Sequence, residues 1–241
     1  MTMSLNGVGF SYPGSEPVLG DLSFDFGRGE IVCLLGPSGC GKSTVLRIVA
    51  GLEISQKGYV EFGSDAPSIG FVFQNASLMP WADVQTNIAL PMKLKGEIDA
   101  CTIEKSLAEV GLDGMGLRYP AQLSGGQQMR VSIARALASN PEILLMDEPF
   151  AALDEILRFQ MNELVLELRA GTGCGILFVT HSLYEAAYIA DRILVMGEGH
   201  IKGEVRPQLD RNLSADEQRA SQRFTDAAKA ISRLLVRGEQ Q

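Results

Sequence analysis

A glycine-rich stretch between residues 36 and 43 has the composition and spacing of a phosphate-binding loop. It fits the pattern G-x-x-x-x-G-K-[ST], with Lys42 and Ser43 in the last two positions. The glycines allow the backbone to curl so that consecutive N–H groups point at phosphate oxygens. Lys42 would bring a positive charge to the β- and γ-phosphates, and the Ser43 hydroxyl would be a ligand of Mg²⁺. The residues expected to contact the nucleotide are Gly36, Pro37, Ser38, Gly39, Cys40, Gly41, Lys42, Ser43 and Thr44.

The surroundings of this stretch favour a nucleotide site over an ordinary turn. An apolar segment at residues 31–35 directly precedes it, and a helical pattern at 43–50 directly follows it. This order places the phosphates at the positive N-terminal end of a helix. The alternative is a glycine-rich turn with an exposed lysine, and a chance match is roughly one in a hundred at this chain length. Cys40, next but one to Lys42, predicts hydrolysis that is sensitive to thiol reagents.

Two acidic residues end a second apolar segment. The four apolar residues 143–146 followed by Asp147 and Glu148 predict a buried strand whose carboxylates emerge at its C-terminal end. Ligands bind at this end of the strands in open α/β sheets. Asp147 would hold Mg²⁺ through water, and Glu148 would be the general base for the attacking water. A strand that merely ends in solvated acids is the alternative for this segment alone, and the phosphate loop disfavours it.

The string L-S-G-G-Q at residues 123–127 predicts a second phosphate-binding position. Ser124 can cap a helix over residues 127–139, and the two glycines leave its first N–H groups uncovered. A helix start of this kind binds anions. Two such positions far apart in one sequence suggest that each nucleotide lies between two copies of the chain. The residues expected to contribute are Ser124, Gly125, Gly126 and Gln127.

The elements that must position these groups alternate between strand and helix patterns. Short apolar segments predict a largely parallel buried sheet flanked by helices, at residues 31–35, 69–73, 143–146, 176–180 and 192–196. More exposed alternating segments predict a small antiparallel layer, at residues 4–10, 21–26 and 58–62. Residues 75–140 carry helical patterns at 103–110 and 127–139 and no convincing buried strand, which predicts a helical insertion. The polar tail beyond residue 206 predicts a helix over 215–235.

Composition excludes several classes of protein. The 241 residues carry a net charge of −8, the wrong sign for a chain whose main partner is nucleic acid. The four cysteines form no C-x-x-C pair, so neither a zinc site nor a disulfide framework is expected. No apolar run approaches the about 20 residues of a membrane span, and no signal peptide is visible.

The motifs together resemble the ABC ATPase family, and the resemblance covers the chain to about residue 205. It implies an α/β fold with a P-loop NTPase (RecA-like) core, an antiparallel β subdomain and an inserted α-helical subdomain. The implied ABC ATPase domain is 1–205, with the core at 1–74 and 141–205 and the helical subdomain at 75–140. A helical tail would occupy 206–241. The implied cofactors are ATP and Mg²⁺.

The same resemblance assigns roles to four further residues. Tyr12 resembles the aromatic residue that stacks on adenine, and Gln74 the glutamine that contacts Mg²⁺ and the attacking water while sensing the membrane partner. Asp154, in the string A-L-D, resembles a residue of the loop that crosses the dimer interface. His181 resembles the switch histidine at the γ-phosphate, where Ser182 replaces the more usual aspartate. Taken alone, Tyr12 would be a surface aromatic, Gln74 a strand-end polar group and His181 a capping or core residue.

Residues 78–88 are similar to the nitrate/sulfonate/taurine importer group, where L-M-P-W followed by V-x-x-N-I is typical. The resemblance implies an ATP-hydrolysing importer subunit, peripheral at the cytoplasmic face of the inner membrane. Its implied partners are a second copy of itself, transmembrane permease subunits and a solute-binding protein, and no nucleic acid. Trp81 would either help form a groove for a permease helix or be a core aromatic of the insertion. The alternatives for the chain are the ATPase of an export or membrane-remodelling complex and a soluble non-transport ABC ATPase.

Overall fold

The computed structural model describes residues 3–63 and 67–237. Its centre is a six-stranded sheet with the order β5-β6-β7-β3-β8-β9. The strands are β3 (Ile31–Leu35), β5 (Ile69–Val72), β6 (Ile143–Asp147), β7 (Gly175–Thr180), β8 (Arg192–Gly197) and β9 (His200–Val205). All neighbouring pairs from β5 to β8 are parallel, so the predicted parallel strands are confirmed, although β5 is only partly buried.

The sixth strand, β9, was not predicted. It pairs antiparallel with β8 at the edge of the sheet and buries none of its residues fully. An edge strand of this kind needs no continuous apolar run, so its sequence H-I-K-G-E-V lacked the pattern that marks a buried strand.

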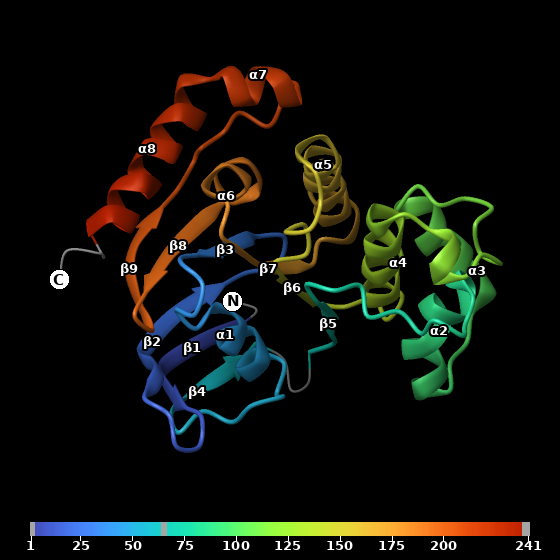
Figure 1. The fold of residues 1–241 in the computed structure, drawn as a ribbon, viewed down its shortest axis with the longest axis horizontal. Helices are drawn as coiled ribbons and strands as arrows, with labels where there is room; N and C mark the ends of the chain where they lie inside the picture. Colours follow the sequence, from blue (N-terminus) through green and yellow to red (C-terminus); the bar gives the residue numbers. More distant parts are fainter. Residues whose placement is uncertain (1–2, 64–66, 238–241) are drawn as a thin grey trace.

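A second, antiparallel sheet has the order β2-β1-β4 and lies at the lower left of Figure 1. It contains β1 (Met3–Ser11), β2 (Pro17–Phe26) and β4 (Lys57–Phe62), which confirms the predicted antiparallel layer. Its buried side chains, including Leu5 and Phe26, pack with Leu46 of helix α1 (Lys42–Val49).

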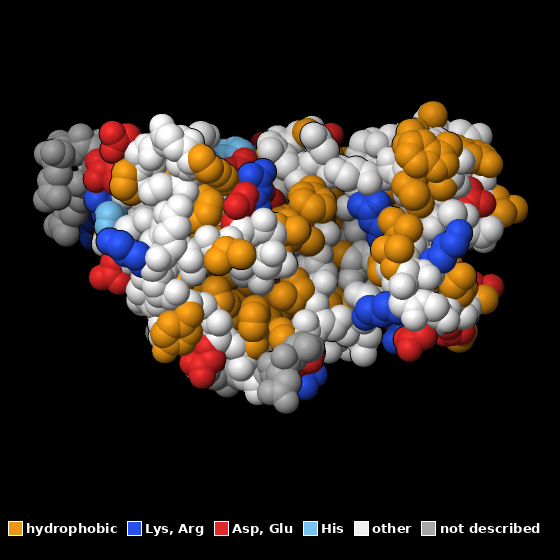
Figure 2. Space-filling model, turned by 90° about the horizontal axis from the view of Figure 1, so that it is seen from below, with side chains coloured by type: hydrophobic (Ala, Val, Ile, Leu, Met, Phe, Trp, Pro, Cys, Tyr) orange, Lys and Arg blue, Asp and Glu red, His pale blue; other side chains and the backbone are white. Residues whose placement is uncertain are grey.

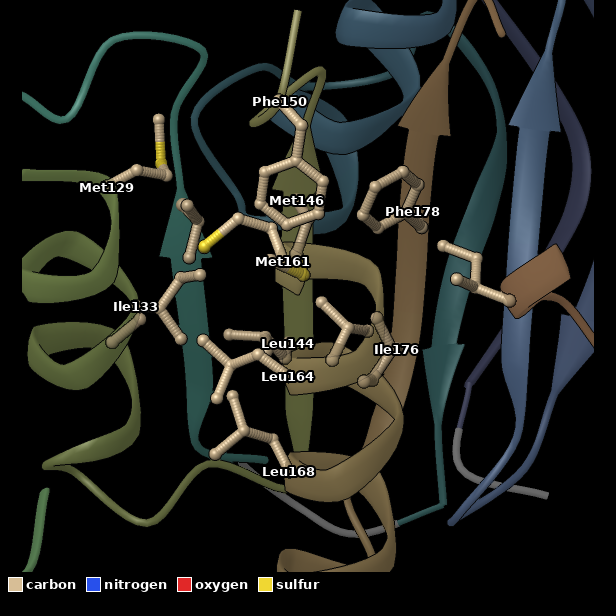
Figure 3. Packing of buried hydrophobic residues seen from close by; sticks show 14 of the residues in the cluster. Met129, Ile133, Leu144, Met146, Phe150, Met161, Leu164, Leu168, Ile176 and Phe178 are labelled. Atoms are coloured by element: carbon tan, nitrogen blue, oxygen red, sulfur yellow. The ribbon is translucent and has the colours of Figure 1, made fainter. Parts of the chain in front are cut away.

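The two faces of the central sheet belong to different clusters of buried residues. Along β3, Ile31, Cys33 and Leu35 face one cluster, whereas Val32 and Leu34 face the other, as the alternation of a strand requires. Helices α5 (Glu155–Thr172) and α6 (Leu183–Ile189) belong to the first cluster. Figure 3 shows how side chains of α5 pack on β6 and β7, namely Met161, Leu164 and Leu168 against Leu144, Met146, Ile176 and Phe178.

Residues 75–140 form the helical region at the right of Figure 1, and the structure contains no strand there. Its elements are α2 (Val84–Lys95), α3 (Ala100–Glu109), the short helix η1 (Pro120–Gln122) and α4 (Gly125–Leu137). The fully buried Asn87 fixes the loop before α2, because its side chain bonds to Met79, Ala82 and Asp83. That loop carries Trp81, whose side chain is 77% exposed, so the interpretation of Trp81 as a core aromatic is wrong.

The described part of the tail contains two helices, α7 (Ala215–Ala220) and α8 (Gln222–Arg237), so the predicted helical stretch 215–235 is helical with one break at Ser221. The chain is extended at Ser221, whose hydroxyl accepts a hydrogen bond from the Phe224 N–H and so begins a new helix. Helix α8 packs on α6 and buries Ala227 and Ile231. Within the described ranges, no helix combines the length and apolar character that crossing a bilayer requires.

Candidate nucleotide-binding site

The phosphate loop connects the end of β3 to the start of α1, and its shape depends on glycine. Gly39 and Gly41 have φ angles of 83° and 99°, which L side chains rarely adopt. At Gly36 a Cβ atom would lie 2.4 Å from the Met196 carbonyl oxygen, so no larger residue fits without movement of the backbone. The local sequence therefore forms the curled backbone that the pattern predicted.

Lys42 lies inside this loop. Its side chain is 4% exposed, and its Nζ donates to the carbonyl oxygens of Gly36 at 2.8 Å and Pro37 at 2.9 Å. The same Nζ lies 3.7 Å from Oε1 of Glu148. Lys42 is therefore held in one position by the loop itself, and its charge faces the carboxylate that follows β6.

Ser43 and Asp147 meet at the C-terminal edge of the sheet. The Ser43 hydroxyl donates to Oδ1 of Asp147 at 2.9 Å. Burial raises the pKa of Asp147, and the hydrogen bond from Ser43 opposes that shift. A hydroxyl and a partly buried carboxylate are the hard oxygen ligands that Mg²⁺ prefers, and a cation would relieve the cost of burying the carboxylate. No cluster of three or more His, Cys, Asp or Glu side chains suited to a metal occurs in the described part of the chain, but Mg²⁺ typically takes one or two carboxylates together with phosphate oxygens.

Glu148 and His181 contact each other across neighbouring strand ends. Nδ1 of His181 lies 3.0 Å from Oε2 of Glu148, and the Glu148 N–H donates to the Val179 carbonyl at 3.0 Å. Glu148 has a φ of 43°, in the left-handed region that is unfavourable for residues other than glycine. Backbone strain of this kind persists where surrounding contacts enforce it, and it concentrates at functional sites. The Glu148 carboxylate is thus set between Lys42 and His181.

Lys42, Ser43 and Glu148 border a cleft of about 420 Å³, whereas Asp147 and His181 are not among its lining residues. The cleft is lined by Tyr12, Val18, Ser38, Gly39, Gly41, Lys42, Ser43, Thr44, Gln74 and Glu148. Tyr12 lies at its rim, with its hydroxyl 3.4 Å from Oγ1 of Thr44 and its ring edge-on to Phe10. The fold therefore brings Tyr12 and Gln74, which are distant in sequence, to the same cleft as the phosphate loop.

The L-S-G-G-Q string does not line this cleft. Ser124 caps α4, and its side chain and that of Gln127 bond reciprocally to each other's backbone N–H groups. The helix begins at Gly125 and not at 127 as predicted, because this capping box includes both glycines in its first turn. Gly126 packs against α5, where a Cβ atom would lie 2.5 Å from Leu157. Asp154 caps α5 by accepting from the Leu157 N–H at 2.9 Å.

Two charged residues beside the site were not predicted. Glu185 is buried on α6, and Arg158 on α5 donates to the carbonyl oxygens of Phe150 and Leu153. The sequence sets Glu185 apart only as a charged residue next to the apolar run A-A-Y-I. Ser182 caps α6 through its hydroxyl, a role that an aspartate could fill equally.

The cysteines allow a direct test of access to the loop. Cys40 is buried, and burial raises the pKa of its thiol although the Lys42 charge opposes the shift. Cys101 is exposed. Because thiolate is the reactive form, N-ethylmaleimide at neutral pH should label Cys40 at least about tenfold more slowly than Cys101, as measured by peptide mass spectrometry. ATPase activity should decline in step with the slow labelling. Labelling of Cys40 as fast as that of Cys101 would contradict the burial of Cys40, and full activity after complete labelling of Cys40 would contradict the predicted thiol sensitivity.

Comparisons with known proteins agree with this geometry. The family described as ABC transporter matches residues 19–151. The taurine import ATP-binding protein TauB of Escherichia coli O157:H7 is 42% identical over 209 residues, which cover 83% of this chain and 81% of TauB. The aliphatic sulfonates import ATP-binding protein SsuB of Bacillus anthracis is 38% identical over 246 residues, covering 99% of this chain and 97% of SsuB.

A solved structure shares the fold. It is a dimeric ATP-binding cassette in a post-hydrolysis state with ADP and phosphate, with a TM-score of 0.75 and 32% identity, covering 85% of this chain and 98% of the other. The predicted fold class is thereby confirmed, and this chain belongs to the ABC transporter family as one of its ATP-hydrolysing cassettes.

Proposed function

We propose that this chain energises the import of a small organic sulfonate, of the taurine or alkanesulfonate class, through a membrane permease. The observation that carries the proposal is the meeting of Lys42, Ser43, Asp147 and Glu148 at one sheet edge, in a chain 42% identical to a taurine import ATP-binding protein. The substrate class rests on the names of the relatives.

Each residue of the cleft has a proposed role. The loop N–H groups and Lys42 bind the phosphates of ATP, and Ser43, Gln74 and Asp147 hold Mg²⁺, which neutralises phosphate charge when bound. Glu148 accepts the proton of the attacking water. His181 holds the Glu148 carboxylate and faces the position of the γ-phosphate.

A second copy would complete the site. Ser124, Gly125 and Gly126 at the N-terminus of α4 do not line the cleft of the phosphate loop in their own chain, and Ser124 and Gly125 are exposed, so this helix start can meet the nucleotide of another copy. Gln127 acts in this proposal by shaping that N-terminus, and Asp154 by holding the loop before α5.

We further propose the division of the chain into a core (1–74 and 141–205), a helical subdomain (75–140) and a tail (206–241).

The helical region offers a surface for the permease. A groove of about 340 Å³ lies between β5 and α2 and is lined by Phe71, Phe73, Leu90, Pro91 and Leu94, among others. Large exposed hydrophobic side chains accompany it in this region, and Figure 2 shows hydrophobic side chains on one face of the helical part. An apolar groove of this kind suits an amphipathic helix. Gln74 directly follows Phe73, so one short segment joins the groove to the nucleotide cleft. Docking there would place the chain at the cytoplasmic face of the membrane, in a complex with a solute-binding protein.

The docking surface can be tested with matched variants. Leu94→Ser in the groove and Trp81→Ala on the exposed loop before α2 should each weaken co-purification with a polytopic membrane protein by about fivefold or more, because truncation of an apolar anchor at an interface costs about 1 kcal/mol or more. Ile54→Ser removes a side chain that is 86% exposed elsewhere, and it should leave the association intact. Vesicles that contain the recovered complex should take up labelled taurine or an alkanesulfonate when ATP is supplied. Recovery with DNA-repair or ribosomal factors instead would overturn the importer proposal.

A further inference from the structure

The turn that carries His181 is bridged by a buried hydrogen bond. Thr180 is the last residue of β7 and is 2% exposed, and Glu185 in the first turn of α6 is 6% exposed. The Thr180 hydroxyl donates to Oε2 of Glu185 and accepts from the Ser182 N–H at 3.0 Å. These two bonds join the residues on either side of His181 to the start of the following helix.

His181 has little other support. Its side chain is 51% exposed, and among the described residues its one side-chain hydrogen bond is the contact with Glu148. The position of its ring therefore depends on the backbone of the turn. A shift of this turn would separate Nδ1 of His181 from the Glu148 carboxylate.

Glu185 occupies a buried, largely apolar position where a carboxylate is energetically unfavourable. Its neighbours on α6 are the buried Ala186, Ala187, Tyr188 and Ile189. Its second carboxylate oxygen, Oε1, is buried and has no hydrogen-bond partner in the described structure. Burial raises the pKa of Glu185, and the bond from Thr180 acts against that shift. A buried carboxylate with one unpartnered oxygen costs stability relative to an apolar side chain of the same size, so stability does not account for its presence.

Glu185 also lies beside the loop that follows β6. Glu185 borders a narrow gap with no room for a water molecule, together with Glu148, Phe150, Ala151 and Arg158. Arg158 holds this loop through the carbonyl oxygens of Phe150 and Leu153. Glu185 therefore lies where the histidine turn meets the loop after Glu148.

We propose that Glu185 is a positioning residue for ATP hydrolysis, which acts through Thr180 to hold the turn 180–182 so that His181 meets Glu148. This inference rests on the roles proposed above for His181 and Glu148. Glu185 is not among the residues that line the cleft of the phosphate loop. Its effect should therefore fall on kcat and leave nucleotide binding nearly unchanged.

Two pairs of variants in the full-length chain test this. Glu185→Met removes the acceptor at nearly constant volume and should lower kcat by about tenfold to a hundredfold, the range expected for a misplacement near 1 Å. The KM for ATP should change less than about twofold. Glu185→Gln keeps an acceptor oxygen and should restore kcat to within about threefold of the original. Thr180→Val should reproduce the loss and Thr180→Ser should not, which keeps the proposal testable if Glu185→Met does not fold.

Tyr188→Phe is the matched control for the loss of a buried hydrogen bond on the same helix. The Tyr188 hydroxyl donates to Glu163 and lies outside the turn 180–182. This variant should lower the melting temperature and leave kcat unchanged, which separates positioning from a general loosening of α6.

A double-mutant cycle with His181→Ala decides the mechanism. If Glu185 acts through His181, then Glu185→Met should have no further effect on kcat in the His181→Ala background. An equal loss in both backgrounds would overturn the positioning role, as would normal kcat in folded Glu185→Met and Thr180→Val. If His181→Ala itself leaves kcat unchanged, then the proposed role of His181 fails as well, so the two failures are distinguishable.

Discussion

Replacement of Glu148 by glutamine should lower the steady-state ATPase rate of this chain by at least about a hundredfold, because positioned general bases typically contribute 10² to 10⁴. Glutamine keeps the size of the side chain and its hydrogen bonding to His181, but it cannot accept the proton of the attacking water. Nucleotide affinity should not fall, since Lys42 loses a competing negative charge 3.7 Å away.

The same variant should accumulate an ATP-bound dimer. If hydrolysis reopens the closed dimer, then a chain that binds MgATP without hydrolysing it should remain dimeric. Light scattering or gel filtration should then report twice the monomer mass. Glu142→Gln is the matched control, because Glu142 directly precedes the other end of β6. It should hydrolyse ATP at the normal rate and show no trapped dimer. A normal rate in Glu148→Gln would remove Glu148 from the role of base.

Replacement of Lys42 by alanine should weaken ATP binding by at least about tenfold, because charge-assisted hydrogen bonds contribute roughly 1.5–3 kcal/mol. The structure makes this side chain costly to lose for a second reason. Lys42 donates to the carbonyl oxygens of Gly36 and Pro37, so alanine removes an internal support of the loop as well as its charge. Hydrolysis should fall together with binding.

Titration with a fluorescent ATP analogue measures this effect without turnover. Lys229→Ala removes an equal charge from the exposed face of α8 and should change the affinity by less than about twofold. Unchanged affinity in a folded Lys42→Ala chain would count against the phosphate loop as the principal nucleotide contact.

Much of the fold was predictable because its signals are local. The curled loop depends on glycine spacing, and buried parallel strands are short apolar runs whatever lies beside them. Edge elements carry weaker signals. Strand β9 is half exposed and was missed, and the break between α7 and α8 depends on one serine in a polar segment that otherwise favours a helix.

The sequence predicted which residues would form the candidate site, but it did not predict how they are arranged. The motifs indicated that Lys42, Glu148 and His181 belong together, but not that Glu148 would contact both of the others, nor that its backbone would be left-handed. The alternatives for Trp81 could not be separated from the sequence, because exposed and buried tryptophans occur in similar patterns. Exposure of 77% decided between them.

The sequence by itself determined the local features on which the proposed chemistry rests: a glycine-rich loop, two acids at a strand end and a helix capped by a serine before two glycines. Each of these is encoded in a few consecutive residues, since backbone conformation and capping are short-range effects. Only the tertiary structure decided which groups touch, because contacts between strand ends depend on sheet order. The parallel pairing of β6 and β7 brings Glu148 and His181 together. The buried hydrogen bond between Thr180 and Glu185 forms only when α6 packs on the sheet, so the sequence alone does not reveal it.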